Sequence, residues 1–223
     1  MNALRANRYT DDWRRFIKGC HPPRAIVCIS AHWCTRGHFV KANDYPKTLH
    51  DFSGFPQTLH ELKYPCPGAP ELAAKISHRS AGSIDLSFEW GLDHGCWSLL
   101  VHMYPAADIP VVQLSIDTRD SPEALFQLGQ SLQWLRDESV MVIGSGNITH
   151  NIQQWLENPE GPCGWARDFD QAVADALSRN DSDALINYTE LPGAEHSVPT
   201  PEHYLPLLAI AGLRRSDDAL KMT

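Results

Sequence analysis

The sequence lacks any apolar run close to the length of a transmembrane helix, which needs about 20 apolar residues. Its opening stretch, MNALRANRYTDDWRRF (1–16), is polar, has the pattern of an amphipathic helix, and does not resemble a secretion signal. These two absences argue against a membrane-spanning protein and against a secreted one. We therefore expect a cytoplasmic protein.

Basic residues are also scarce. The chain has 223 residues, with 19 Lys and Arg against 27 Asp and Glu, so its net charge at pH 7 is -8. Proteins that bind nucleic acid without sequence preference need a basic surface, and anionic membranes attract basic segments. The charge balance therefore predicts neither nucleic acid nor a membrane as a partner.

Several catalytic signatures are missing. The segment GSGN (144–147) lacks the lysine of a phosphate-binding loop and the spacing of a dinucleotide-binding loop. The sequence contains neither a G-x-S-x-G elbow nor an H-E-x-x-H zinc motif. No two of the six cysteines are spaced C-x-x-C, and the chain is too long for a disulfide scaffold, so we expect reduced and mostly buried thiols.

What the sequence does contain is an alternation of buried strands and helices. Three apolar runs without polar alternation predict strands that are covered on both faces: 25–30, 109–116 and 140–145. Apolar residues at helical spacing predict three helices: 69–80, 122–137 and 166–179. This order predicts an α/β fold, a single-domain three-layer α/β/α sandwich around a mixed, mostly parallel sheet that spans residues 1–223. The long loop 41–68 has no clear periodicity, which in a compact domain often indicates function.

The chain has 11 histidines. Four of them lie next to predicted strands, helices or turns. In open α/β sheets, ligands bind at the carboxyl ends of the strands, so these positions could contribute to a site. His32 follows the run 25–30, His150 follows the run 140–145, His94 lies between two glycines, and His203 precedes an apolar helix. Each has an ordinary structural explanation, such as a backbone hydrogen bond for His32 or the first turn of a helix for His203. A zinc clip of His32 with nearby cysteines is disfavoured by the cysteine spacing. The pattern is consistent with a non-haem metal centre, because imidazole is the commonest metal ligand in proteins.

Five blocks of the sequence, in order, resemble one family along nearly the whole chain: SAHW (30–33), HDFSGFPQTLHELKYPCPGAPELA (50–73), EWGLDHGCWSLLVHMYPAADIPVVQLSID (89–117), GSGNITHN (144–151) and PTPEHYLPLL (199–208). The family is the class III extradiol ring-cleaving dioxygenases, and the blocks are most similar to its bacterial 4,5-DOPA extradiol branch. The resemblance implies a single α/β catalytic domain and extradiol cleavage of a catechol such as DOPA with O2. It also implies iron(II) as the cofactor, with zinc(II) as the other metal expected in the same site.

The resemblance assigns roles to particular residues. His32 and His203 match metal ligands, and His150 matches a position that is either a third ligand or the acid/base histidine. His94 matches a pocket histidine that contacts substrate or oxygen and is the second choice for acid/base catalysis. Four further side chains are expected to line the substrate pocket: Trp33, Phe52, Phe55 and His196.

The family's first strand normally ends in HGSPMNA, whose histidine is a metal ligand, whereas this sequence begins at MNA. We expect a start codon placed too late; a truncated chain and a protein that has lost its metal are the alternatives. For the chain as given we expect impaired stability and activity. The missing ligand keeps open a second function, an inactive or zinc-bound binding protein on the same scaffold, and the histidines alone are also compatible with a zinc-dependent hydrolase.

Overall fold

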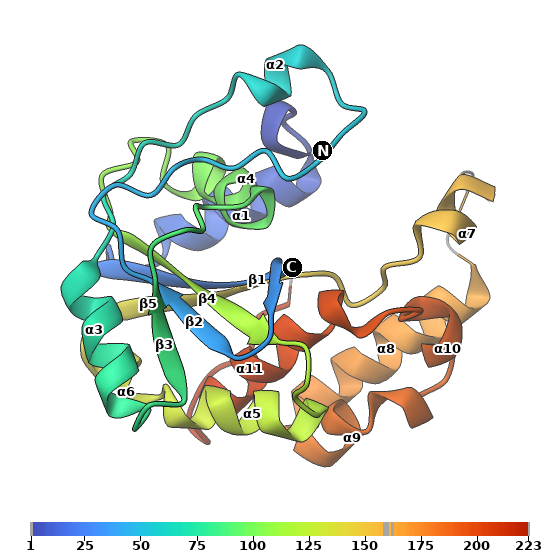
Figure 1. The fold of residues 1–223 in the computed structure, drawn as a ribbon. Coiled ribbons are helices and arrows are strands. Elements are labelled where there is room, and N and C mark those ends of the chain that lie inside the picture. Colours follow the sequence, from blue (N-terminus) through green and yellow to red (C-terminus); the bar gives the residue numbers. More distant parts are fainter. Residues whose placement is uncertain (1, 158–160, 162, 223) are drawn as a thin grey trace.

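A computed structural model describes residues 2–157, 161 and 163–222, and its centre is a five-stranded sheet of order β3-β2-β4-β1-β5 (Figure 1). The strands are β1 (Ala25–Thr35), β2 (His38–Lys41), β3 (Ile84–Ser87), β4 (Val111–Asp117) and β5 (Val140–Ser145). β1 pairs in parallel with both β4 and β5, and β2 pairs in parallel with β3. Among the strand pairs of the described residues, the β2–β4 contact is the antiparallel one. The predicted mixed, mostly parallel sheet is confirmed.

Helices cover both faces of this sheet. On one side lie α1 (Arg8–Lys18), α2 (Gln57–His60) and α4 (His94–Met103), and on the other lie α3 (Pro70–Arg79), α5 (Pro122–Ser131), α6 (Trp134–Asp137), α8 (Gly164–Arg179), α9 (Ser182–Ile186) and α11 (Leu205–Leu213) (Figure 1). The short elements are η1 (Asn2–Leu4), α7 (Ile152–Glu157), η2 (Tyr188–Glu190), α10 (Ala194–Ser197) and η3 (Pro201–His203). The three-layer α/β/α sandwich expected from the sequence is therefore present.

The two cores follow from the alternation of side chains along β1. Val27 and Ile29 pack in a cluster with Leu125 of α5 and Leu208 of α11. Cys28 points to the opposite face, into a second cluster that contains residues of α4 and of the long loop. A strand that is apolar at every position is buried on both faces, which explains why the run 25–30 shows no polar alternation.

Two predicted helices differ from the structure, and both differences have local causes. The N-terminal helix begins at Arg8 because Asn7 caps it, accepting hydrogen bonds from the N–H groups of Tyr9 and Thr10; Met1 lies outside the described residues. The predicted helix 122–137 divides into α5 and α6, since the backbone between them makes i→i+3 hydrogen bonds such as that from Leu132 to Gly129. β2 and β3 were not predicted from the sequence, because a strand of four residues is too short to show a clear pattern of apolar and polar side chains.

β1 also continues beyond its predicted end at Ser30. Its pairing with β5 stops at Ser30, whereas its pairing with β4 resumes at Cys34 after a shift of register that follows Ile29. His32 therefore lies within an irregular part of β1 and not after it. Such irregularities commonly redirect a side chain near an active site.

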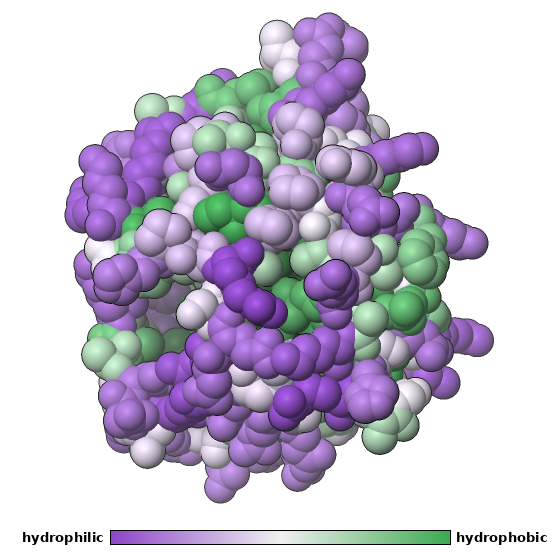
Figure 2. All heavy atoms as spheres, turned by 90° about the vertical axis from the view of Figure 1, so that its left-hand side faces the viewer, coloured by the Kyte–Doolittle hydropathy of each residue, from purple (hydrophilic) through white to green (hydrophobic). Residues whose placement is uncertain are grey.

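One face of the surface agrees with the polar composition. The face drawn in Figure 2 is largely hydrophilic, with apolar residues in small separate groups. Among the helices of the described residues, none has the length and apolar character that a membrane crossing requires.

The contact between α5 and α11 depends on two glycines. A Cβ at Gly129 would overlap the carbonyl oxygen of Ala209, and one at Gly212 would overlap that of Phe126. We expect Gly129→Ala to lower the free energy of unfolding by about 2 kcal/mol, because two backbones must separate. Urea denaturation measures this, with Gly164→Ala as the control, since a Cβ at Gly164 meets nothing within 4 Å. Equal stability of the two variants would contradict the prediction.

Candidate metal centre

The four histidines singled out in the sequence lie together at the carboxyl ends of β1 and β5. The ring centroid of His32 lies 3.9 Å from that of His94 and 5.0 Å from that of His203. The ring of His150 stacks on that of His203 at 3.5 Å, with an angle of 9° between their planes. His94 is the first residue of α4, and His203 ends η3. The fold therefore gathers side chains from four separate parts of the chain.

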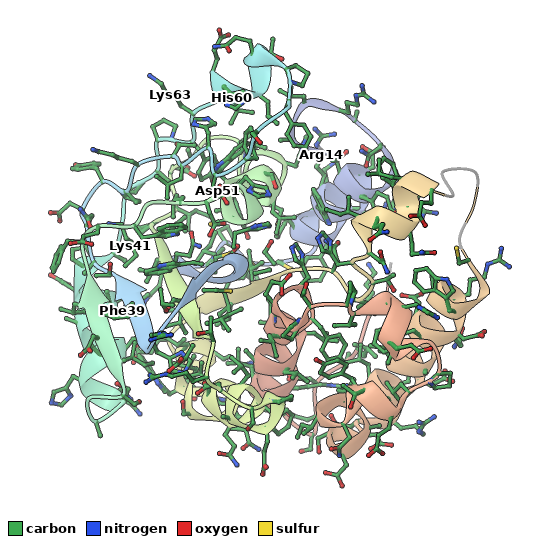
Figure 3. All side chains as sticks on the ribbon, turned by 45° about the vertical axis from the view of Figure 1, so that its right-hand side comes forward. Arg14, Phe39, Lys41, Asp51, His60 and Lys63 are labelled. Carbon is green, nitrogen blue, oxygen red and sulfur yellow. The ribbon has the colours of Figure 1, made fainter. Side chains whose placement is uncertain are left out.

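Asp51, from the long loop 41–68, completes the cluster. Its carboxylate accepts a hydrogen bond from the backbone N–H of His94 at 2.8 Å and lies 2.9 Å from Nδ1 of the same residue. The carboxylate also lies 3.9 Å from Nδ1 of His32. Ligand atoms of His32, Asp51 and His94 all lie within 4.8 Å of one another, a spacing that suits a bound cation. Figure 3 shows Asp51 near α4, on the side of the sheet that the long loop covers.

Asn147 links the two stacked histidines. Its side-chain nitrogen lies 3.4 Å from Nδ1 of His150 and 3.3 Å from Nδ1 of His203. Backbone bonds hold the same region, from the N–H of Asn147 to the carbonyl of His203 and from the N–H of His150 to the carbonyl of Ser197. A Cβ at Gly146 would overlap the carbonyl oxygen of His203, so the GSG segment serves close backbone approach here.

Asp93 connects the two elements that carry His94 and His32. It is fully buried, caps α4 by accepting from the N–H of Cys96 at 3.1 Å, and accepts from the hydroxyl of Ser30 at 2.8 Å. The side-chain amide of Gln113 donates to its other oxygen. Burial raises the pKa of Asp93, while these hydrogen bonds oppose that rise. Because Ser30 belongs to β1, Asp93 ties α4 to the strand that carries His32.

Burial also determines the charge state of the histidines. It lowers the pKa of His32 to about 4, with His94 adding repulsion, and lowers that of His203 to about 3, with His150 adding repulsion. Burial lowers the pKa of His150 as well. Burial would raise the pKa of Asp51, but hydrogen bonds from His94 hold it below its usual value. At neutral pH His32, His150 and His203 are thus neutral and Asp51 is ionised, the forms in which these side chains bind a metal.

The remaining predicted site residues lie at different distances from the cluster. Phe52 contacts the ring of His94 at 5.4 Å, and Phe55 contacts Phe52 at 5.4 Å while remaining 42% exposed. Trp33 is buried and stacks on Trp90 at 5.8 Å. His196 has a side chain that is 55% exposed, and its ring packs against Trp165. Among the described residues, Phe52 is the aromatic side chain whose ring contacts the histidine cluster, through His94.

The cysteines take no part in the cluster. Cys28, Cys66 and Cys96 are buried thiols, Cys20 and Cys163 are half-buried, and Cys34 is exposed; all six are free. Cys34 donates to the carbonyl of Ala31. The free thiols agree with the sequence prediction, although fewer of them are buried than expected.

Sequence reasoning missed three residues of this site. Asp51 follows His50 in the loop that had been marked as functional, so the loop was identified but the carboxylate was not. Asp93 directly precedes His94 in the sequence and is a buried cap of α4. Asn147 had been considered only as part of a glycine-rich segment. An acidic residue beside a histidine at an expected junction is the signal that would have identified Asp51 and Asp93.

Imidazoles and a carboxylate converge at the carboxyl ends of the strands in a three-layer α/β sandwich. This arrangement is that of an α/β enzyme whose site suits a metal ion. The chain belongs to the family described as the catalytic LigB subunit of aromatic ring-opening dioxygenase, whose model matches residues 4–222. It is therefore an extradiol aromatic ring-opening dioxygenase, of a family that generally depends on a metal. The family recognised in the sequence is confirmed.

Individual relatives agree with this assignment. The chain is 44% identical over 219 residues to 4,5-DOPA dioxygenase extradiol of Escherichia coli (strain K12), covering 95% of this chain and 80% of that protein. It is 39% identical over 212 residues to 4,5-DOPA dioxygenase extradiol of Beta vulgaris, covering 93% and 79%. The crystal structure of the uncharacterized protein JW3007 from Escherichia coli K12 superposes with a TM-score of 0.81 at 38% identity, covering 94% of this chain and 83% of that one.

Proposed function

We propose that this chain cleaves the ring of a catechol such as DOPA in the extradiol manner, with O2 as the second substrate and iron(II) as the cofactor. The observation that carries the proposal is the meeting of His32, His94, His150 and His203 with Asp51 in one site. The names of the E. coli and Beta vulgaris relatives support DOPA as the substrate.

The side chains present fit a metal of this kind. Non-haem iron(II) in oxygenases is held by imidazoles and a carboxylate on one side, and zinc(II) accepts the same donors. We propose His32 and His203 as residues that hold it, with His150 as either a third ligand or the acid/base histidine. When bound, iron(II) would supply a centre at which catechol and O2 react together.

We assign proton transfer to the histidines. A catechol must lose a proton on binding, and a neutral imidazole can accept it near pH 7. His150 is our first choice, because its pKa is lowered and the imidazole is therefore neutral. If His150 is a ligand instead, His94 takes this role, supported by the Asp51 carboxylate at its Nδ1. Such acid–base help typically contributes about 10²–10⁴-fold in rate.

Aromatic side chains are proposed to surround the ring of the substrate. Phe52 is the best placed, since its ring packs edge-on against that of His94 with an interplanar angle of 88°. Phe55 packs behind Phe52 and is assigned to the same wall. Trp33 and His196 are proposed as outer contacts of the pocket.

The proposal is tested by adding DOPA and O2 to the protein loaded with iron(II) and recording the yellow ring-opened product by absorbance and mass. Product that contains both atoms of ¹⁸O2 supports extradiol cleavage. Binding of zinc or iron without any product from several catechols would favour the binding protein on the same scaffold instead.

The variant His150→Phe separates the two roles of His150. If this residue transfers a proton, the variant is expected to retain metal and to lose about 10²–10⁴-fold in turnover rate. Metal content by mass spectrometry and single-turnover kinetics measure the two effects. Loss of metal together with turnover would make His150 a ligand and would assign proton transfer to His94.

A further inference from the structure

Two cavities border His150. One, of about 280 Å³, is lined by residues that include Thr149, Trp155 and Trp165. The other, of about 370 Å³, is lined by residues that include Pro199, Thr200 and Glu202. Both include His150, Asn151, Ile152 and Gln154 in their walls. A larger cavity of about 660 Å³ lies by α1 and the C-terminal segment and includes none of the clustered histidines. A ring bound at the cluster would therefore have open space beside His150 into which a substituent could extend.

The charged side chain that lines these cavities is acidic. Glu202 is the carboxylate among their lining residues, and none of the described lining residues of either cavity is a lysine or arginine. The hydroxyl of Thr200 donates to one oxygen of Glu202 at 2.7 Å, and among the described residues its other oxygen accepts no hydrogen bond. His150 and Glu202 both line the cavity of about 370 Å³, so Glu202 lies beside the cluster.

We infer that Glu202 is a specificity-determining residue which binds the ammonium group of a catechol carrying an aminoalkyl chain. An ammonium beside a carboxylate forms a charge-assisted hydrogen bond, whereas a carboxylate on the substrate would meet a like charge without a cationic partner. The site thus selects amine-bearing catechols over neutral ones, and neutral ones over catechols whose only charge is negative. This inference rests on the proposed function for the position of the ring, and it goes further by naming the group that selects among catechols.

Equilibrium binding tests the inference without turnover. Three ligands share the ring and differ in the charge of the side chain: dopamine, 4-ethylcatechol and 3,4-dihydroxyphenylpropionate. Their dissociation constants are measured by calorimetry in the absence of O2, with metal-free protein and with iron(II)-loaded protein. For the native chain we expect dopamine to bind about tenfold more tightly than 4-ethylcatechol, equivalent to about 1.4 kcal/mol, and the propionate to bind most weakly.

The variant Glu202→Gln removes the charge and keeps the shape of the side chain. It is expected to bring the dopamine-to-ethylcatechol ratio of affinities close to one. Glu195→Gln is the matched control, because the side chain of Glu195 is 83% exposed and lines neither cavity, and it should keep the native ratio.

The binding experiment and the test of the proposed function can fail independently of each other. Equal affinities for the three ligands, binding of none of them, or an unchanged ratio in Glu202→Gln would each overturn the inference. Selective binding of dopamine that depends on Glu202, with no ring-opened product in the aerobic assay, would uphold the inference and refute the proposed reaction.

Discussion

Replacing His32 by alanine is expected to abolish metal binding and ring opening together. The side chain lies at the centre of the cluster, within 3.9 Å of the ring of His94 and 5.0 Å of the ring of His203. Its lowered pKa, about 4, keeps the imidazole neutral and available to a metal at neutral pH. We expect stoichiometric iron(II) in the native protein after loading and desalting, and less than about one tenth of that in the variant, since losing a ligand weakens binding by far more than tenfold.

The control for this experiment is His78→Ala, on the exposed side of α3, which also removes one imidazole and should leave metal content unchanged. Thermal unfolding of the metal-free forms establishes that both variants fold. A His32→Ala protein that folds and retains normal iron content would refute the ligand role. In that case the Asp51 and His94 pair would be the remaining candidate ligands on this side of the cluster.

The replacement Asp93→Ala is expected to have the largest effect on stability. It removes the cap of α4 and leaves the hydroxyl of Ser30 and the amide of Gln113 without their acceptor in a fully buried place. The loss of a cap costs about 1 kcal/mol, and a buried donor without a partner costs about 1–3 kcal/mol. We expect the free energy of unfolding to fall by about 3 kcal/mol, measured by urea denaturation.

Asp93→Asn is the matched control. An asparagine keeps an oxygen that can cap α4 and accept from Ser30, so it should lose less stability than alanine. Because Asp93 joins α4 to β1, we also expect the alanine variant to bind metal more weakly, as His94 and His32 lose their common support. If alanine and asparagine are equally stable, the hydrogen bonds of Asp93 contribute nothing and the account of this support is wrong.

Much of the fold could be predicted because its signals are local. The run 140–145 is a strand with the predicted bounds; α3 differs from its predicted range by one residue at each end, and α8 by two residues at its start. Burial on both faces removes polar alternation from a central strand, and a buried helix face repeats at helical spacing; both patterns are visible in a short window. The division of α5 from α6 was not visible, because Leu132 and Leu135 are both buried and continue the same apolar stripe.

The sequence by itself determined the α/β class, the buried strands and the four histidines near element ends, since these depend on the order of residues along the chain. The tertiary structure alone decided which side chains meet. Asp51 reaches His94 across 43 residues of sequence, and Asn147 reaches His203 across 56. Contacts at such separations leave no local pattern, because they arise from how the loop 41–68 and η3 pack onto the sheet. The irregularity that places His32 inside β1 likewise depends on pairing with β4, a strand more than 75 residues further along the chain.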